Sequence, residues 1–171
     1  MSDGSVPGEP FLREAVRALV VDDDGRTLLV RFEFSAGTRW ALPGGGIDAG
    51  ESVREALRRE LIEEIGLYDP EIGPQLWMRT HHIRFHIWDG QREQVFVVRV
   101  PNGFEPQPML SWEQLHDESV YELRWWTADE LDELQPQTNP PQLAQALRSY
   151  VEFGPPDEID VFVEHSVSPK A

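Results

Sequence analysis

The hydrophobic pattern in the first part of the chain predicts two pairs of strands. Four stretches combine apolar runs or alternation with β-branched and aromatic residues, which favours strands. An Asp-Gly turn separates the two members of each pair, and such turns commonly join antiparallel strands in hairpins. The predicted strands are Ala15–Val21, Thr27–Phe34, Leu76–Trp88 and Arg92–Val100, with turns at Asp22–Gly25 and Asp89–Gly90.

The later part of the chain is predicted to contain a long loop followed by shorter elements. The stretch Pro101–Val120 contains proline and several acidic residues. A loop longer than about 12–15 residues in a compact domain is often functional. The elements predicted after it are a strand at Glu122–Thr127, a helix at Ala128–Leu134, a linker at Gln135–Pro140, a helix from Pro141 to Gly154 and an added strand at Ile159–Val163.

The stretch between the two strand pairs predicts a helix, because it has no Gly or Pro between Ser52 and Ile65. Ser52 and Glu55 stand three residues apart and fit a capping box, which predicts the start of the helix. Gly66 is suited to the left-handed conformation that ends many helices. We therefore expect one helix from Ser52 to Gly66.

This helix has an apolar stripe and an acidic stripe side by side when it is drawn at roughly 100° per residue. The apolar stripe consists of Val53, Leu57, Leu61 and Ile65, and the acidic stripe contains Glu60, Glu63 and Glu64. Carboxylates four residues apart repel one another, so a cation between them would explain the arrangement. Oxygen ligands suit hard cations, which predicts Mg²⁺, with Mn²⁺ as the alternative. A solvated acidic face is the competing interpretation.

The spacing of residues around the helix resembles the Nudix box, the sequence signature of the Nudix hydrolases. Every fixed position of that pattern is filled in this chain. The pattern runs Gly45, five residues, Glu51, seven residues, Arg59-Glu60-Leu61, one residue, Glu63-Glu64, one residue and Gly66-Leu67. The resemblance implies the α/β fold of the family, an α/β/α sandwich with a mixed central sheet.

The resemblance also implies roles for individual residues. The expected metal ligands are Glu60, Glu63 and Glu64, together with a carbonyl group near Gly45, and the same three glutamates with Arg59 form the expected catalytic set. Glu51 and Arg59 match supporting positions, and Arg59 is expected to orient the carboxylates through an ion pair. In several branches of the family a later loop supplies the general base, and the candidates here are Glu113, Asp117 and Glu118.

Candidates for substrate binding lie outside the box. Arg79 and Arg84 belong to the predicted strand Leu76–Trp88, and guanidinium groups pair well with phosphate oxygens. Four tryptophans are candidates for stacking on a base: Trp77, Trp112, Trp125 and Trp126. The neighbouring His81 and His82 do not predict a zinc site, because no third His or Cys follows at a suitable spacing.

Composition and charge restrict the classes of protein that fit. The 171 residues suit one domain, which we place at 11–154, between a flexible arm at 1–10 and a C-terminal extension at 155–171. No apolar run approaches the ~20 residues that span a bilayer, so no membrane association is expected. The net charge of −16 argues against nucleic acid as a partner. The absence of cysteine excludes disulfides and a thiol nucleophile.

The sequence thus predicts a cytoplasmic enzyme that hydrolyses a pyrophosphate bond in a nucleoside diphosphate linked to another group. Nucleoside triphosphates, nucleotide sugars and ADP-ribose are the substrate classes that the resemblance implies, and a homodimer remains open. A catalytically silent Nudix-like module that binds or senses nucleotides is the alternative. Isomerisation of an isoprenoid diphosphate, which occurs in a relative of the fold, uses a cysteine that this chain lacks.

Overall fold

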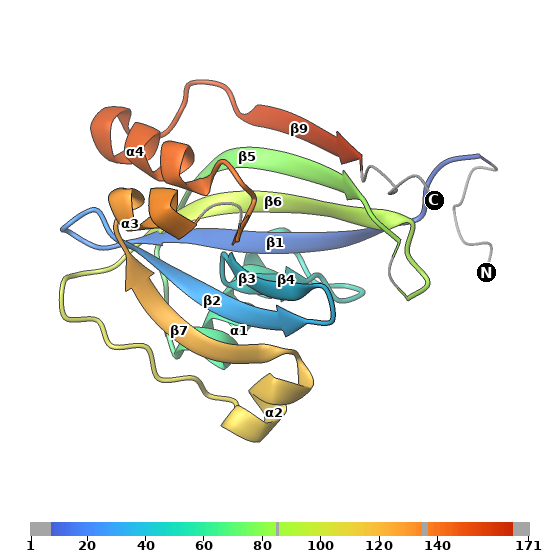
Figure 1. Ribbon diagram of the computed structural model, residues 1–171, viewed down its shortest axis with the longest axis horizontal. Coiled ribbons are helices and arrows are strands. Elements are labelled where there is room, and N and C mark those ends of the chain that lie inside the picture. The colour runs from blue at the N-terminus through green and yellow to red at the C-terminus, as the bar shows by residue number, and fades with distance from the viewer. Residues whose placement is uncertain (1–7, 85, 135–136, 166–171) are drawn as a thin grey trace.

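The structure, a computed structural model, describes residues 8–84, 86–134 and 137–165. Its strands and helices are arranged as Figure 1 shows. The strands are β1 (Leu12–Val21), β2 (Thr27–Phe34), β3 (Gly37–Ala41), β4 (Gly44–Gly46), β5 (Ile72–His82), β6 (Gly90–Arg99), β7 (Val120–Trp126), β8 (Thr138–Asn139) and β9 (Asp160–His165). The helices are α1 (Val53–Ile65), α2 (Trp112–Asp117), α3 (Ala128–Leu134) and α4 (Leu143–Phe153).

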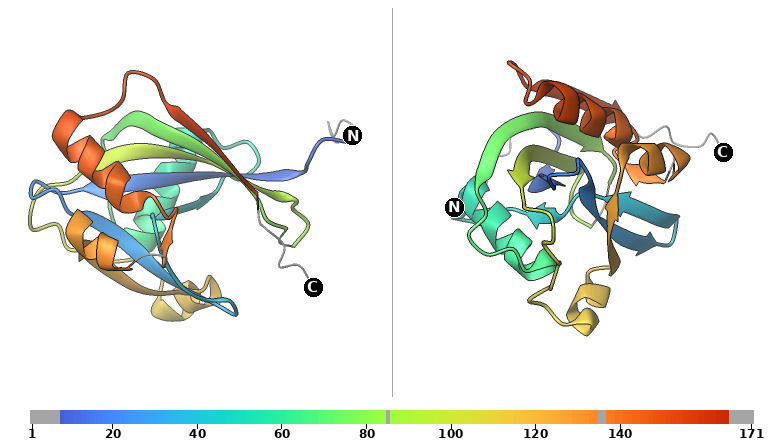
Figure 2. Two further views of the ribbon diagram at one scale, coloured as in Figure 1. Left: turned by 45° about the horizontal axis from the view of Figure 1, so that its top comes forward. Right: turned by 90° about the vertical axis from the view of Figure 1, so that its left-hand side faces the viewer.

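One curled sheet contains the nine strands of the described chain. Seven of them follow the order β8-β3-β2-β1-β6-β5-β9, while β4 pairs with β1 and β7 pairs with β2. The pairs β1–β6, β5–β9 and β3–β8 are parallel and the other pairs are antiparallel, so the sheet is mixed. The curl is clearest in the end-on view of Figure 2, where α1 lies on one side of the sheet and α3 and α4 on the other.

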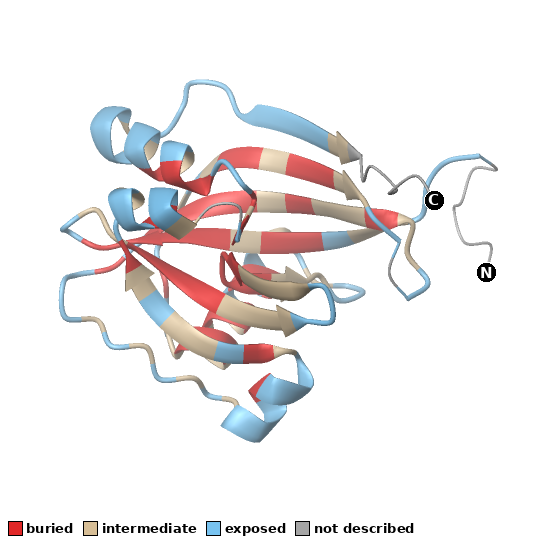
Figure 3. Cartoon of the chain, in the orientation of Figure 1, coloured by how far each residue is buried: buried red, intermediate tan, exposed pale blue. Residues whose placement is uncertain are grey.

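Strand β1 shows why helices cover both faces of the sheet. Its buried residues alternate between two hydrophobic clusters, with Ala18 and Val20 in the cluster of α1, and Leu19 and Val21 in the cluster of α3 and α4. A strand with apolar side chains on both faces needs a layer on each side. Figure 3 shows the result as buried central strands beneath helices whose outer surfaces are exposed. The predicted α/β/α sandwich is therefore confirmed.

Helix α1 begins and ends as the sequence predicts. The Ser52 hydroxyl accepts a hydrogen bond from the Glu55 amide, and the Glu55 carboxylate accepts one from the Ser52 amide, which completes the capping box. Gly66 ends the helix in the left-handed conformation, with a φ of 67°. Leu57, Leu61 and Ile65 of the predicted stripe are buried against β1, and Val53 packs there partly buried.

The prediction for the long loop Pro101–Val120 was wrong in part, because it contains helix α2. Ser111 and Gln114 form a capping box there, and Leu115 is fully buried against Val30 and Val120. A helix of one and a half turns has too few positions to show a clear hydrophobic period, so its caps were its only strong signal. The short strands β3 and β4 were also not predicted.

The boundaries of the long strand β5 differ from the prediction at both ends. It begins at Ile72 rather than Leu76 and ends at His82 rather than Trp88. Beyond His82 the backbone leaves the sheet, and His86 adopts a positive φ of 49° that does not belong to an extended strand. Phe85 lies outside the described residues.

The C-terminal strand predicted at Ile159–Val163 is present as β9, shifted to Asp160–His165. It adds to the outer edge of β5 in parallel register, with Glu164 opposite His81. Thr138 and Asn139, in the predicted linker, pair with β3, while residues 135 and 136 lie outside the described residues. Most of the predicted arm, residues 1–7, and the last six residues are likewise not described, so the domain boundaries stay a prediction.

Candidate active site

The loop before α1 brings two glutamates of the helix against the sheet. Glu60 and Glu64 are 8% and 3% exposed, which is rare for carboxylates. The Glu64 carboxylate accepts a hydrogen bond of 3.4 Å from the Gly44 amide. Glycine is needed beside them, because a Cβ at Gly45 would lie only 2.5 Å from Glu60 Oε1. The glycine run therefore lets the backbone of β4 approach the acidic stripe of the helix.

Arg59 joins the helix to the loop through several carboxylates. Its Nε and Nη2 donate hydrogen bonds of 2.7 and 2.9 Å to the two oxygens of Glu51. Its Nη1 donates to Glu60 Oε1 at 2.9 Å and lies 3.5 Å from Glu63. The hydrogen bonds from Arg59 lower the pKa of Glu51 to about 2, so Glu51 is ionised at neutral pH and holds the guanidinium group in place.

Replacing Arg59 with Ala is expected to lower turnover about 10- to 100-fold, the usual cost of losing an orienting partner beside a metal site. The reason is that Glu60 and Glu63 would lose their common guanidinium neighbour, while Arg59 itself cannot ligate a cation. Turnover at saturating Mg²⁺ is measured beside Arg58→Ala, which removes an exposed arginine from the same turn. Equal turnover in the two variants would show that Arg59 does not orient the carboxylates.

The buried carboxylates repel one another in the absence of a cation. Burial raises the pKa of Glu64 well above its usual range, and the neighbouring Glu60 raises it further, with Arg17 and the Gly44 amide opposing this in part. Burial and Glu60 also raise the pKa of Glu63. The protein therefore concentrates negative charge where water is scarce, which a bound cation would stabilise.

No three His, Cys, Asp or Glu side chains are arranged to hold a metal ion as they stand within the described ranges. Glu60 accepts a hydrogen bond from Arg59, and Glu64 accepts one from the Gly44 amide. The donor set nevertheless fits a hard cation, because it consists of carboxylate oxygens that are largely shielded from water and close to one another in sequence. The predicted assignment of Gly45, Glu60, Glu63 and Glu64 as ligands stays a prediction.

A pocket of about 810 Å³ lies near these carboxylates, although none of them lines it. Arg17 connects the two, since it lines the pocket and its Nη1 donates hydrogen bonds to the carbonyl oxygens of Leu42 and Gly44. Basic and aromatic side chains gather in the pocket wall, which suits an anionic ligand with an aromatic group. They include Arg13, Arg17, Arg39, His81, Phe32, Phe34 and Trp88.

Alternation along the strands explains how the pocket is built. Leu19 and Val21 of β1 belong to the core on the α3 and α4 side of the sheet. Arg13 and Arg17 lie an even number of residues before them, nearer the start of the strand. Side chains two residues apart lie on the same face of a strand. One face of the sheet is thus apolar at one end and basic at the other. A charge inside an otherwise apolar run, as at Arg17, was the signal that could have identified this wall from the sequence.

The structure places the other predicted residues in different surroundings. Arg79 is 3% exposed and pairs with Glu93 and Glu164, whereas Arg84 is exposed and pairs with Asp89. Trp77 and Trp126 lie in the core, Trp125 packs beside it, and Trp112 is exposed on α2. None of these six residues lines the pocket. Their substrate-binding roles stay predictions.

Two of the three candidate bases line the pocket, namely Asp117 and Glu118. Burial and then Glu60 raise the pKa of Glu118, which places its carboxylate in the field of the acidic stripe. Glu113 is exposed in the first turn of α2 and does not line the pocket. The pocket wall therefore favours Asp117 and Glu118 over Glu113, and the effect of Glu60 on its pKa singles out Glu118.

Comparison with known proteins identifies the family. The sequence profile of the NUDIX domain matches residues 11–150. The chain belongs to the Nudix family. A curated relative, the nucleoside triphosphatase NudI of Escherichia coli O139:H28, is 38% identical over 85 residues, which are 46% of this chain and 59% of the relative. The match thus spans less than two thirds of the length of the relatives that it reaches.

Solved Nudix structures have the same fold. The MutT Nudix hydrolase of Burkholderia pseudomallei superposes with a TM-score of 0.59 at 28% identity, over 80% of this chain and 95% of the other. The Nudix domain of NrtR from Shewanella oneidensis, solved with ADP ribose, gives a TM-score of 0.62 at 23% identity, over 86% and 94% of the two chains. The similarity to the NrtR domain supports only a shared fold.

Proposed function

We propose that this Nudix protein hydrolyses a pyrophosphate bond in a nucleoside diphosphate linked to another group, with the help of a divalent cation. The observation that carries the proposal is that an arginine of the pocket wall and a buried carboxylate of α1 both bind the backbone of Gly44. Arg17 lines the pocket and donates to the Gly44 carbonyl, and the Gly44 amide donates to Glu64. A polyphosphate chain bound by the arginines would lie next to the acidic stripe.

The residues of the chain suit the separate tasks of the reaction. Arg13, Arg17 and Arg39 would bind the phosphate oxygens and neutralise their charge. Mg²⁺ or Mn²⁺ held by Glu60, Glu63 and Glu64 would polarise the phosphoryl group and acidify water when bound. The Glu118 carboxylate would accept a proton from the attacking water. Its raised pKa lies closer to neutral pH than that of an ordinary carboxyl group, which suits a general base.

The aromatic wall supports a nucleotide as the substrate. Phe32 and Phe34 stack with ring centroids 5.7 Å apart and an interplanar angle of 5°. Phe34 is 52% exposed, so its ring remains accessible to a base. NudI relatives are named nucleoside triphosphatases, so a triphosphate belongs to the proposed class, beside the nucleotide sugars and ADP-ribose that the family resemblance implies.

A second candidate function is binding of a nucleotide without turnover. The observation in its favour is that the three box glutamates, among the described residues, do not form a ready-made metal site. The intact set of box carboxylates and the acid Glu118 beside them favour the enzyme.

The two functions are separated by a panel of nucleoside triphosphates, nucleotide sugars, ADP-ribose and dinucleoside polyphosphates with Mg²⁺. We expect release of a mononucleotide from at least one substrate, measured by anion-exchange chromatography. Glu64→Gln purified in parallel controls for contaminating phosphatases. Saturable nucleotide binding with no product from any member of the panel would support the silent module instead.

No helix in the described parts of the chain is long and apolar enough to cross a membrane. We further expect a cytoplasmic location and no nucleic acid partner. A homodimer is compatible with the proposal. The net charge of −16 supports the absence of a nucleic acid partner, since a basic patch for nucleic acid is difficult to build on such a surface.

A further inference from the structure

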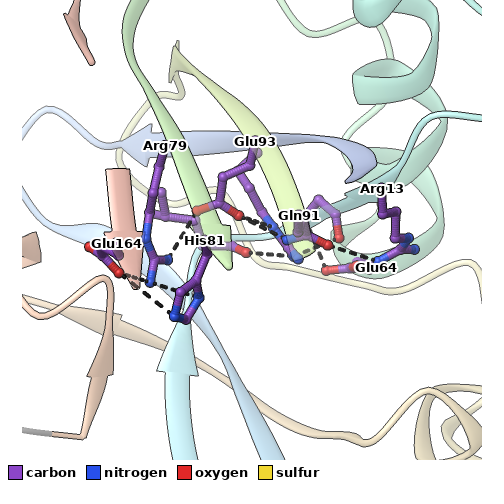
Figure 4. A network of polar contacts seen from close by, with 10 residues as sticks. Arg13, Glu64, Arg79, His81, Gln91, Glu93 and Glu164 are labelled. Carbon is purple, nitrogen blue, oxygen red and sulfur yellow. Dashed lines mark hydrogen bonds and ion pairs between the residues drawn. The ribbon is translucent and has the colours of Figure 1, made fainter. Parts of the chain in front are cut away.

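A series of ion pairs connects the C-terminal strand β9 with the pocket (Figure 4). Arg79 Nη2 on β5 donates a hydrogen bond of 2.7 Å to Glu164 Oε2 on β9. Arg79 Nη1 donates one of 3.2 Å to Glu93 Oε1 on β6, and Glu93 Oε2 lies 3.4 Å from Arg17 Nε on β1. We call these four residues the relay, because they link four strands side by side across the sheet.

A branch of the relay reaches the second pocket arginine. Gln91 Nε2 donates a hydrogen bond of 3.2 Å to Glu93 Oε2, and Gln91 Oε1 accepts one of 3.1 Å from Arg13 Nη1. Glu93 therefore contacts Arg17 directly and Arg13 through Gln91. Both arginines line the pocket, so the position of one carboxylate influences both of them.

Strand register places the relay on the polar end of one sheet face. Arg79 lies two residues after the core residue Trp77, and Glu93 two residues before the core residue Val95. Residues of equal parity share a face, so both side chains continue the face of the pocket. Strand β9 extends that face by one strand, and its Glu164 is the carboxylate beside Arg79.

Burial makes the second carboxylate of the relay necessary. The Arg79 side chain is 4% exposed and that of Glu93 is 9% exposed, whereas that of Glu164 is 28% exposed. A buried guanidinium group must be compensated by nearby carboxylates. Without Glu164, Glu93 alone would have to balance the charges of both Arg79 and Arg17. With Glu164 in place, Arg79 has a second counter-ion, which also lies 3.9 Å from His81 Nε2, and the second oxygen of Glu93 holds Arg17.

We propose that Glu164 is a positioning residue for the substrate pocket. By pairing with Arg79 it keeps Glu93 in contact with Arg17 and Gln91, and so holds Arg17 and Arg13 where they bind a diphosphate group. Strand β9 follows residues 11–150, the part matched by the family profile, so the C-terminal extension contributes this function. The inference rests on the proposed function in that its ligand is a diphosphate group.

The test replaces Glu164 with Gln in the full chain. We expect the KM for the best nucleotide to rise about three- to tenfold, less than the 10- to 100-fold cost of losing a direct orienting partner. We expect kcat to change by less than about twofold, because the carboxylates of α1 are not altered. Calorimetry with methylenediphosphonate, which has a P–C–P unit that cannot be hydrolysed, should show the same three- to tenfold weakening in Kd.

Two further variants control the experiment. Glu158→Gln removes an exposed carboxylate from the same extension and should leave KM and Kd unchanged. Glu164→Asp keeps the charge and should restore part of the affinity. In a Glu93→Gln background, Glu164→Gln should weaken the Kd for methylenediphosphonate little further, because the relay passes through Glu93. A purely structural role would lower Tm but would leave Kd unchanged at temperatures well below Tm.

The results test the role of Glu164 separately from the proposed hydrolysis. Equal Kd values for wild type and Glu164→Gln, or an equal loss in Glu158→Gln, would overturn the inference. A wild-type chain that binds no methylenediphosphonate would also overturn it, since the arginines would then have no such ligand to bind. If Kd responds as expected but no nucleotide is hydrolysed, the proposed function fails and the role of Glu164 stands.

Discussion

Replacing Glu64 with Gln is expected to lower turnover about 100-fold or more, comparable with the loss of a principal group that stabilises the transition state. Glu64 is the most deeply buried of the box carboxylates and lies beside Gly44, which joins it to the pocket through Arg17. Glutamine has the same shape and keeps an oxygen that can accept the hydrogen bond from the Gly44 amide. The substitution therefore removes the charge while it preserves the packing.

Stability and activity should respond differently to this substitution. Glu60 and burial both disfavour the ionised form of Glu64, so its neutral replacement should not lower Tm when EDTA is present. Turnover, Tm and circular dichroism are compared with Glu71→Gln, which removes an exposed carboxylate elsewhere. Turnover of Glu64→Gln close to that of Glu71→Gln would contradict the assignment of Glu64 to the metal site.

Removal of divalent cations is expected to abolish turnover, and Mg²⁺ or Mn²⁺ should restore it, whereas Na⁺ should not. The acidic stripe supplies only carboxylate oxygens, and the chain has no cysteine, so hard divalent cations are the ions that its chemistry selects. A monovalent ion polarises a phosphoryl oxygen too weakly to replace them. Product formation is followed during titration with EDTA and after the addition of each cation in excess.

The control for this experiment is the folded state of the chelated protein. Circular dichroism in EDTA should match that of the protein with Mg²⁺, because the capping box and the apolar stripe hold α1 in place without a cation. Turnover that persists in rigorously chelated buffer would exclude the proposed mechanism.

Features that depend on neighbours in the sequence were predictable. The capping box of Ser52 and Glu55 and the ending at Gly66 lie within single turns of the helix, so the sequence identified both ends of α1. The Asp22–Gly25 turn and the strands beside it were located for the same reason. The predicted turn at Asp89–Gly90 was wrong, because β5 ends at His82 and Gly90 is already the first residue of β6. Helix α2 was missed although Ser111 and Gln114 also form a capping box, because the apolar stripe that supports such a signal is reduced to Leu115.

Features that depend on pairing between distant strands were not predictable. Arg17 lies within the predicted strand Ala15–Val21, and only the pairing of the sheet places it beside Glu93, 76 residues away. Arg79 was predicted to bind substrate, but its surroundings depend on Glu164, which is 85 residues away and belongs to a strand at the edge of the sheet. The family resemblance covered the acidic stripe and gave no information about either contact.

The same distances determine when the pocket can form as the chain folds. Strand β1 pairs in parallel with β6, and Arg13 and Arg17 bind partners 78 and 76 positions away, while Arg79 and Glu164 are 85 positions apart. Closing such long loops costs entropy before the contacts repay it, and folds dominated by non-local pairs are slow to form. Helix α1 can form early from its own caps, but its carboxylates meet the pocket arginines only after most of the chain has been synthesised and has closed the sheet. The site is therefore a late product of folding, although its signature is local in the sequence.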